Sequence, residues 1–221
     1  MMCLLVSTSM VSTASAADVS GSLTIPTKLL VAPSTGCADR ACYWNEQNGV
    51  YPSRPYRLSP ARHITVVLTS QRQQTTESQT VLLHGGGFLP STVVVANGAT
   101  LNISNADGFH RAPIVTGLQG FNTTTLRSGD SVTAKLLATG HWVLGDKLIP
   151  HARGNLHVIS NLAAVGEVND SGTFRITDVE PGAYTLVVYY QQHILASQQI
   201  FVPSKGQLKV DPIALSEPKP N

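Results

Sequence analysis

The chain has 221 residues, of which 13% are charged, and its formal net charge is +2. The Lys and Arg residues are scattered, so the composition excludes a basic face for nucleic acid and an acidic tail. The 18 Gly and 13 Pro residues, with many Ser, Thr and Val, favour short strands and turns over helices. This length suits one large β domain or two small ones.

The N-terminus has the pattern of a secretory signal peptide. Residues 1–16 are apolar or small, contain no acid and end in Ala14-Ser15-Ala16, which fits a cleavage site. A disordered N-terminus rich in Ser and Thr is the alternative. We expect export to the periplasm, the outer membrane or the cell exterior. No other stretch reaches the ~18 apolar residues of a membrane span, so none is expected in the mature chain.

The first third of the chain predicts two strands separated by a long loop. Residues 19–31 alternate weakly and predict an edge strand, and residues 63–69 predict a strong strand. Residues 32–62 between them carry several Pro and Gly, which is typical of a surface insert. This loop contains Cys37 and Cys42, and two cysteines so close in an exported protein predict a local disulfide. A polar linker follows over residues 71–79.

From residue 80 the pattern becomes a series of short strands, which is typical of a β-sandwich. The triple glycine at residues 85–87 lacks the Lys and the helix of a phosphate cradle, so it predicts a turn. The predicted strands cover residues 80–84, 88–95, 100–105, 131–137, 140–144 and 155–160.

The last third contains a predicted two-strand hairpin over residues 172–190, with its turn fixed by Pro181-Gly182. The run Gly-x-Phe-x-Ile followed by Val-x-Pro-Gly-x-Tyr-x-Leu resembles the signature of carboxypeptidase-regulatory-like, or transthyretin-like, sandwich modules. In such modules the opening strand has the form that residues 19–23 supply. The resemblance therefore implies one sandwich built from both ends of the chain, with another inserted between them.

Residues 105–110 have the form Asn-x-Asp-x-x-His. In this motif the inserted part resembles the cupredoxins, whose type-1 copper site uses two His, one Cys and one Met, and the resemblance implies that His110 is at one of the His positions. The other three ligand positions fall on Asp146, Ile149 and Ala152. Aspartate is a hard oxygen ligand that cannot replace the thiolate, and the other two side chains have no donor atom. Electron transfer through type-1 copper is thus not expected.

The combined order is similar to exported bacterial proteins described as methylamine-utilisation-like. The resemblance implies an all-β fold with two sandwich units, a cupredoxin-like Greek-key sandwich nested in or joined to a carboxypeptidase-regulatory-like sandwich. We expect a signal peptide over 1–16, the two parts of the regulatory-like sandwich over 17–79 and 163–212, the cupredoxin-like domain over 80–162, and a flexible tail over 213–221. The family implies a periplasmic copper protein, but the substitutions at the ligand positions separate fold from function.

We therefore expect a non-catalytic, exported binding or structural module of the cell envelope, with no cofactor. Its partner would be another envelope or surface protein, or a glycan. The alternative is a copper or zinc site formed by His110, Asp146 and His151. No recognisable nucleophile, zinc-protease or nucleotide motif occurs, so an enzyme is not expected. The aromatic residues Trp142, Tyr184, Tyr189 and Tyr190 suit either core packing or a partner contact.

Overall fold

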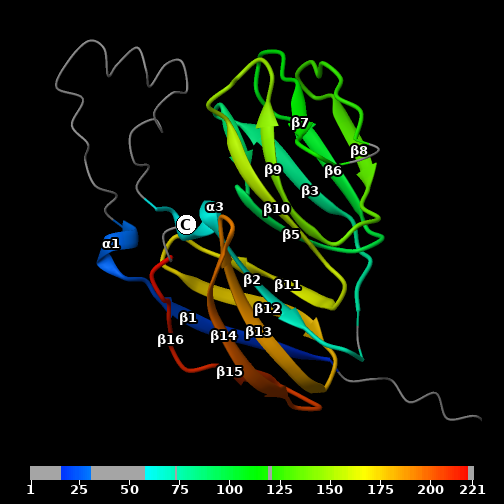
Figure 1. The fold of residues 1–221 in the computed structure, drawn as a ribbon. Coiled ribbons are helices and arrows are strands. Elements are labelled where there is room, and N and C mark those ends of the chain that lie inside the picture. Colours follow the sequence, from blue (N-terminus) through cyan, green and yellow to red (C-terminus); the bar gives the residue numbers. More distant parts are fainter. Residues whose placement is uncertain (1–15, 31–57, 73, 119–120, 219–221) are drawn as a thin grey trace, which may run out of the picture.

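The computed structural model describes residues 16–30, 58–72, 74–118 and 121–218, and these residues are almost entirely β-structure (Figure 1). Residues 1–15 of the predicted signal peptide and the predicted disulfide between Cys37 and Cys42 lie outside the described residues. The elements are β1 (Ala17–Thr24), α1 (Thr27–Leu30), α3 (Pro60–His63), β2 (Ile64–Thr69), β3 (Gln79–His84), β4 (Gly87–Leu89), β5 (Thr92–Ala96), β6 (Thr100–Asn105), β7 (Pro113–Val115), β8 (Ser131–Lys135), β9 (Gly140–Asp146), β10 (Arg153–Ile159), β11 (Leu162–Val168), β12 (Thr173–Val179), β13 (Gly182–Tyr190), β14 (His193–Val202), β15 (Gln207–Lys209) and β16 (Ile213–Ala214).

Strands from both ends of the chain form one eight-stranded sheet, which we call the outer unit. Its order is β14-β13-β2-β11-β12-β1-β15, and β16 pairs with β1. The strands between β2 and β11 in sequence form separate sheets, so one unit is nested within the other, which is one of the two arrangements that the resemblance implies. Whether the outer unit belongs to the carboxypeptidase-regulatory-like modules, and where the domain boundaries fall, stay predictions.

The nested strands, residues 79–159, form two four-stranded sheets that we call the inserted sandwich. Their orders are β5-β10-β9-β7 and β4-β3-β6-β8. Alternating side chains such as Leu101 and Ile103 of β6 are fully buried and meet Leu144 and Leu156 of the other sheet in one core. The predicted single segment over residues 88–95 is two strands, β4 and β5, in different sheets. The break falls at Pro90, which has no N–H to donate to a sheet.

The predicted hairpin over residues 172–190 is wrong in its pairing, although both strands exist. β12 and β13 are separated in the sheet by β2 and β11. Phe174 of β12 and Leu186 of β13 nevertheless enter the same buried cluster, so the sheet folds over this core. The connection between them is therefore an arch between two layers. The Tyr184 hydroxyl donates a 2.9 Å hydrogen bond to the Glu180 carbonyl and fixes the arch.

β2 is buried along its whole length because both of its faces meet a core. Val66 and Leu68 enter the core of the outer unit, whereas Val67 enters the core of the inserted sandwich. The Thr65 hydroxyl donates a 2.6 Å hydrogen bond to the carbonyl of Thr92 in β5. This position between two cores explains the continuous apolar run in the sequence.

The C-terminal segment differs from the predicted flexible tail at residues 213–216. β16 pairs in parallel with β1, and Ile213 and Leu215 are buried. The Ser216 N–H donates a 2.9 Å hydrogen bond to the Leu195 carbonyl of β14. Burying two large side chains favours an ordered segment, since each is worth roughly 1.5–3 kcal/mol.

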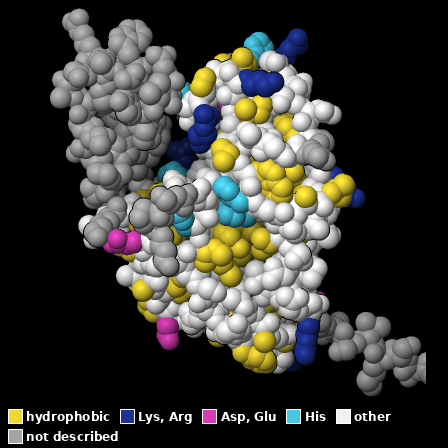
Figure 2. All heavy atoms as spheres, in the orientation of Figure 1, with side chains coloured by type: hydrophobic (Ala, Val, Ile, Leu, Met, Phe, Trp, Pro, Cys, Tyr) yellow, Lys and Arg dark blue, Asp and Glu magenta, His cyan; other side chains and the backbone are white. Residues whose placement is uncertain are grey.

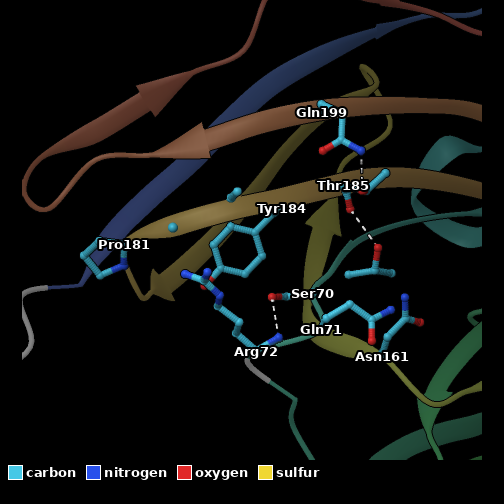
Figure 3. Close-up of a pocket in the computed structure, with 11 residues that line it drawn as sticks. Ser70, Gln71, Arg72, Asn161, Pro181, Tyr184, Thr185 and Gln199 are labelled. Carbon is cyan, nitrogen blue, oxygen red and sulfur yellow. Dashed lines mark hydrogen bonds between the residues drawn. The ribbon is translucent and has the colours of Figure 1, made fainter.

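The surface of the described residues carries few charges. On the face drawn in Figure 2, Lys and Arg side chains are separate spots among uncharged atoms. A pocket of about 390 Å³ lies where β2 ends and β13 begins, and Figure 3 shows its lining. Within the part of the chain that the structure describes, no helix is long and apolar enough to cross a membrane.

Candidate functional site

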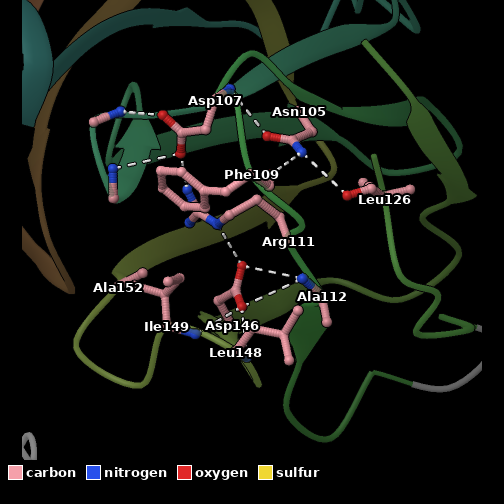
Figure 4. A network of polar contacts seen from close by, with 12 residues as sticks. Asn105, Asp107, Phe109, Arg111, Ala112, Leu126, Asp146, Leu148, Ile149 and Ala152 are labelled. Carbon is pink, nitrogen blue, oxygen red and sulfur yellow. Dashed lines mark hydrogen bonds and ion pairs between the residues drawn. The ribbon is translucent and has the colours of Figure 1, made fainter. Parts of the chain in front are cut away.

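The two segments that contain the ligand positions expected from the copper-site resemblance, residues 105–110 and 146–152, meet at one end of the inserted sandwich (Figure 4). β6 ends at Asn105, the loop after it carries Asp107 and Arg111, and β9 ends at Asp146. The Lys147 N–H donates a 2.9 Å hydrogen bond to the Ala112 carbonyl, which holds the two segments together.

Asp146 has no exposed side-chain surface, and its oxygens are already engaged. Its Oδ1 accepts hydrogen bonds from the N–H groups of Leu148 and Ile149 at 2.8 and 3.0 Å. Its Oδ2 accepts one from Arg111 Nε at 2.7 Å. The Ala112 N–H lies 3.3 Å from both oxygens. The carboxylate thus closes the loop after β9 and binds a cation of the chain itself.

Arg111 is fully buried, which is rare for an arginine and requires paired charges. Its Nη1 donates to Asp107 Oδ2 while its Nε donates to Asp146. Its Nη2 is buried without a hydrogen-bond partner among the described residues. The planar guanidinium suits this position because it directs donors toward two carboxylates at once. The Phe109 ring centroid lies 5.9 Å from its central carbon.

Asp107 links the arginine to the triple-glycine turn. Its Oδ1 accepts a 2.7 Å hydrogen bond from the Gly85 N–H, and its Oδ2 lies 3.5 Å from the Gly86 nitrogen. These two glycines have φ values of +61° and +73°, where side chains are strained. The predicted turn therefore binds the Asp107 carboxylate through its backbone N–H groups. On the other side, Asn105 Oδ1 accepts a 3.0 Å hydrogen bond from the Asp107 N–H.

We call Asp107, Arg111 and Asp146 the buried charge network. Two carboxylates and one guanidinium give it a formal charge of −1 within the protein interior. Breaking such a network by removing one partner leaves a buried charge uncompensated and costs about 3–5 kcal/mol. The network therefore locks the loops at this end of the sandwich in one arrangement.

The structure does not bring the predicted alternative metal ligands together. His110 and His151 are exposed, whereas Asp146 is buried against Arg111. The described residues contain no group of three or more His, Cys, Asp or Glu side chains placed to hold a metal ion. At the other two expected copper-ligand positions, Ile149 packs against the core of the inserted sandwich and Ala152 is buried in it.

Sequence reasoning missed Asp107 and Arg111 as partners of Asp146. One signal was present, since Arg111 is followed by the apolar run Ala112-Pro113-Ile114-Val115 and stands four residues after Asp107. A charged residue beside a buried strand calls for a partner of opposite charge. The spacing does not reveal that Asp146, 35 residues later, supplies it.

The aromatic residues are mostly packing residues. Tyr184 and Tyr189 are buried, Tyr190 packs against the core of the outer unit, and Trp142 packs against that of the inserted sandwich. Large exposed apolar side chains occur elsewhere, and Phe201 of β14 is 70% exposed.

No protein-family profile matches the chain, and no curated protein matches it in sequence. Solved structures that are similar to part of it are copper proteins. A copper-containing nitrite reductase from Thermus scotoductus shares 22% identity over 38% of this chain and 22% of its own, with a TM-score of 0.34. A purple cupredoxin from Nitrosopumilus maritimus shares 17% identity over 36% of this chain and 98% of its own, with a TM-score of 0.34. A reduced amicyanin variant shares 12% identity over 44% of this chain and 99% of its own, with a TM-score of 0.36. The chain spans about a fifth of the nitrite reductase, and in all three cases less than half of this chain is matched.

Proposed function

We propose that the protein is a non-catalytic, exported binding or structural module of the cell envelope, built on a cupredoxin-like sandwich that does not carry a copper centre. Its partner is an envelope or surface protein, or a glycan. The observation that carries the proposal is the buried charge network. Its ion pairs occupy the carboxylates of Asp107 and Asp146 at the end of the sandwich where the resemblance would place a copper site.

Two physical reasons support the absence of a metal centre. The first is ligand chemistry, since a blue-copper site needs a thiolate and two imidazoles, and Asp146, Ile149 and Ala152 provide none of these. The second is electrostatics. A metal ion at Asp146 would compete with the Arg111 guanidinium, 2.7 Å away, for the same carboxylate. A metal ion on this carboxylate would also lie close to the guanidinium, and two positive charges about 4 Å apart repel by about 4 kcal/mol at an effective dielectric constant of about 20.

The nested architecture supports a scaffold. Two rigid β units present loops at several ends, which is how many binding modules place their contact residues. The same architecture is compatible with many chemistries, so the function must rest on the sites and not on the fold.

Calorimetric titration of the purified protein with Cu(II) and Zn(II), followed by metal analysis, tests the proposal. We expect no stoichiometric binding tighter than about micromolar, which a dedicated site of several ligands would exceed. The matched variants are His110→Ala and His151→Ala, with His193→Ala as a control histidine elsewhere on the surface. Stoichiometric copper or an intense visible colour overturns the proposal. Zinc binding that is lost in both site variants and kept in the control restores the alternative metal site.

A further inference from the structure

The pocket at the end of β2 has the chemistry of a ligand site. It is lined by the end of β2 and the residues after it, by the turn before β11, by the start of β13 and by Gln199 of β14. Its volume of about 390 Å³ falls within the range of small-molecule sites. In Figure 3 the Arg72 side chain extends toward Pro181 and Tyr184, and Gln71 and Asn161 lie at the opposite end.

Several neutral hydrogen-bonding side chains line the pocket. Gln71, Asn161 and Gln199 contribute three amides, and each amide offers both donors and acceptors. The Gln199 amide nitrogen donates a 3.1 Å hydrogen bond to the Thr185 hydroxyl, which fixes the amide on the sheet. A sugar hydroxyl also donates and accepts, so a row of hydroxyls matches such amides.

Among the described lining residues, Arg72 is the charged one. Its side chain is exposed three residues after the end of β2, and its backbone N–H donates a 3.2 Å hydrogen bond to the Ser70 hydroxyl. A guanidinium with no acid in the same lining selects a ligand with one negative charge, and a carboxylate fits its planar donors.

An exposed aromatic ring flanks the pocket. Phe201 is 70% exposed and stands directly opposite Ala183, which lines the pocket. It lies two residues after Gln199 on the same strand, so both side chains are on the same face of the sheet. The negative face of an aromatic ring attracts the weakly positive C–H groups of a sugar ring.

We propose that this pocket binds a carboxylate-bearing sugar unit of an acidic glycan. Arg72 holds the carboxylate, the amides of Gln71, Asn161 and Gln199 bind hydroxyls, and Phe201 stacks on the sugar ring. A peptide fits less well, because peptide sites use backbone groups of strand edges or apolar side-chain pockets, whereas the polar groups here are three side-chain amides and one guanidinium, which match hydroxyls and a carboxylate. The inference rests on the proposed binding function and names its ligand.

The test is a calorimetric titration with a galacturonate tetramer, and the neutral galactose tetramer is the matched probe. We expect the acidic tetramer to bind at least about tenfold more tightly, and Arg72→Gln to remove this preference, since a charge-assisted hydrogen bond is worth about that factor. Arg127→Gln removes an exposed arginine elsewhere and should change nothing. Phe201→Ala should weaken both tetramers about tenfold, whereas Ile194→Ala, another exposed apolar residue of β14, should have no effect.

Three results overturn the inference: neither tetramer binds at millimolar concentration, the neutral tetramer binds as tightly as the acidic one, or an acidic tetrapeptide binds as tightly as the acidic tetramer. These failures leave the proposed function in place, because that proposal fails only on stoichiometric metal. The two results are read from separate titrations of the same protein.

Discussion

At the scale of single residues, Arg111 decides the character of the candidate site. It joins the carboxylate of Asp107, in the loop after β6, to that of Asp146, at the end of β9, and all three side chains are buried. Its N–H groups face carboxylate oxygens of Asp107 and Asp146, whose negative charges would otherwise repel each other. The Arg111 guanidinium therefore holds the loop after β6 to the end of β9 through charge pairing within the chain.

Replacing Arg111 by Met tests this role. The change keeps an elongated side chain but leaves Asp107 and Asp146 as two buried carboxylates without their cation. We expect a loss of about 3–5 kcal/mol in the free energy of unfolding, measured with urea at neutral pH.

The matched control is Arg127→Met, because Arg127 is exposed. It should change stability by about 0.5 kcal/mol or less. The triple variant Arg111→Met, Asp107→Asn and Asp146→Asn removes all three charges and should recover part of the loss. A fully stable Arg111→Met variant would show that the network does not hold the loops.

At the scale of elements, close packing between neighbouring strands sets the register of the outer unit. Gly21 of β1 stands opposite Phe174 of β12, and the Phe174 ring lies over the glycine. A Cβ atom at Gly21 would lie 2.6 Å from the ring, which is closer than real contacts allow. The glycine thus makes room for the largest side chain on the neighbouring strand.

Gly21→Ala should therefore destabilise the protein by about 1–3 kcal/mol, as overpacking in a core does. Thermal unfolding followed by circular dichroism measures the effect. Gly108→Ala is the control, since a Cβ there meets nothing within 4 Å and its φ is not positive. That variant should be neutral or slightly stabilising. Equal melting temperatures for the two variants would contradict the packing argument.

The positions of individual strands were the feature that the sequence predicted best. The strands over residues 64–69, 79–84, 100–105 and 131–135 fall within a few residues of the predicted ones, because each alternates or is bounded by turn residues. The pairing of β12 and β13 could not be read in the same way. A Pro-Gly turn between two strands is typical of a hairpin, but here it serves an arch fixed by Tyr184.

At the scale of the whole molecule, the two units share a junction that contains a buried histidine. His157 of β10 is 8% exposed, and its Nε2 donates a 2.6 Å hydrogen bond to the Gln191 carbonyl of the outer unit. Its ring lies between the rings of His141 and Tyr189, which are tilted against it, with 4.7 Å between centroids on each side. Burial lowers the pKa of His157, the Gln191 carbonyl opposes this, and the nearby His141 lowers it further.

This junction predicts a loss of stability in weak acid. The folded pKa of His157 is below its ordinary value of 6.5, so on acidification the unfolded chain binds a proton first. The stabilisation is therefore full above about pH 6.5 and is lost as the pH falls from there toward the folded pKa. Burial lowers the pKa of His63 as well, so both histidines act in the same direction.

Urea unfolding at about pH 7.5 and about pH 5.5 measures this loss. In His157→Gln the amide can still donate to the Gln191 carbonyl, and the difference between the two pH values should shrink. It should vanish almost completely when His63→Gln is added, apart from the contribution of other groups. His110→Gln, at an exposed position, is the control and should keep the full difference. An unchanged difference in the double variant would rule out these histidines as the cause.

The sequence by itself determined the all-β class, the position of most strands, and the lack of thiolate, imidazole and thioether side chains at Asp146, Ile149 and Ala152. These features are local, since they depend on alternation, turn residues and the identity of single side chains. The tertiary structure decided that one unit is nested in the other, that Asp146 meets Arg111, that the triple-glycine turn holds Asp107, that β12 and β13 lie apart, and that a pocket with three amides and Arg72 lies beside Phe201. Each of these joins residues far apart in the chain, and the energies that join them, charge pairing and burial, leave no periodic trace in the sequence.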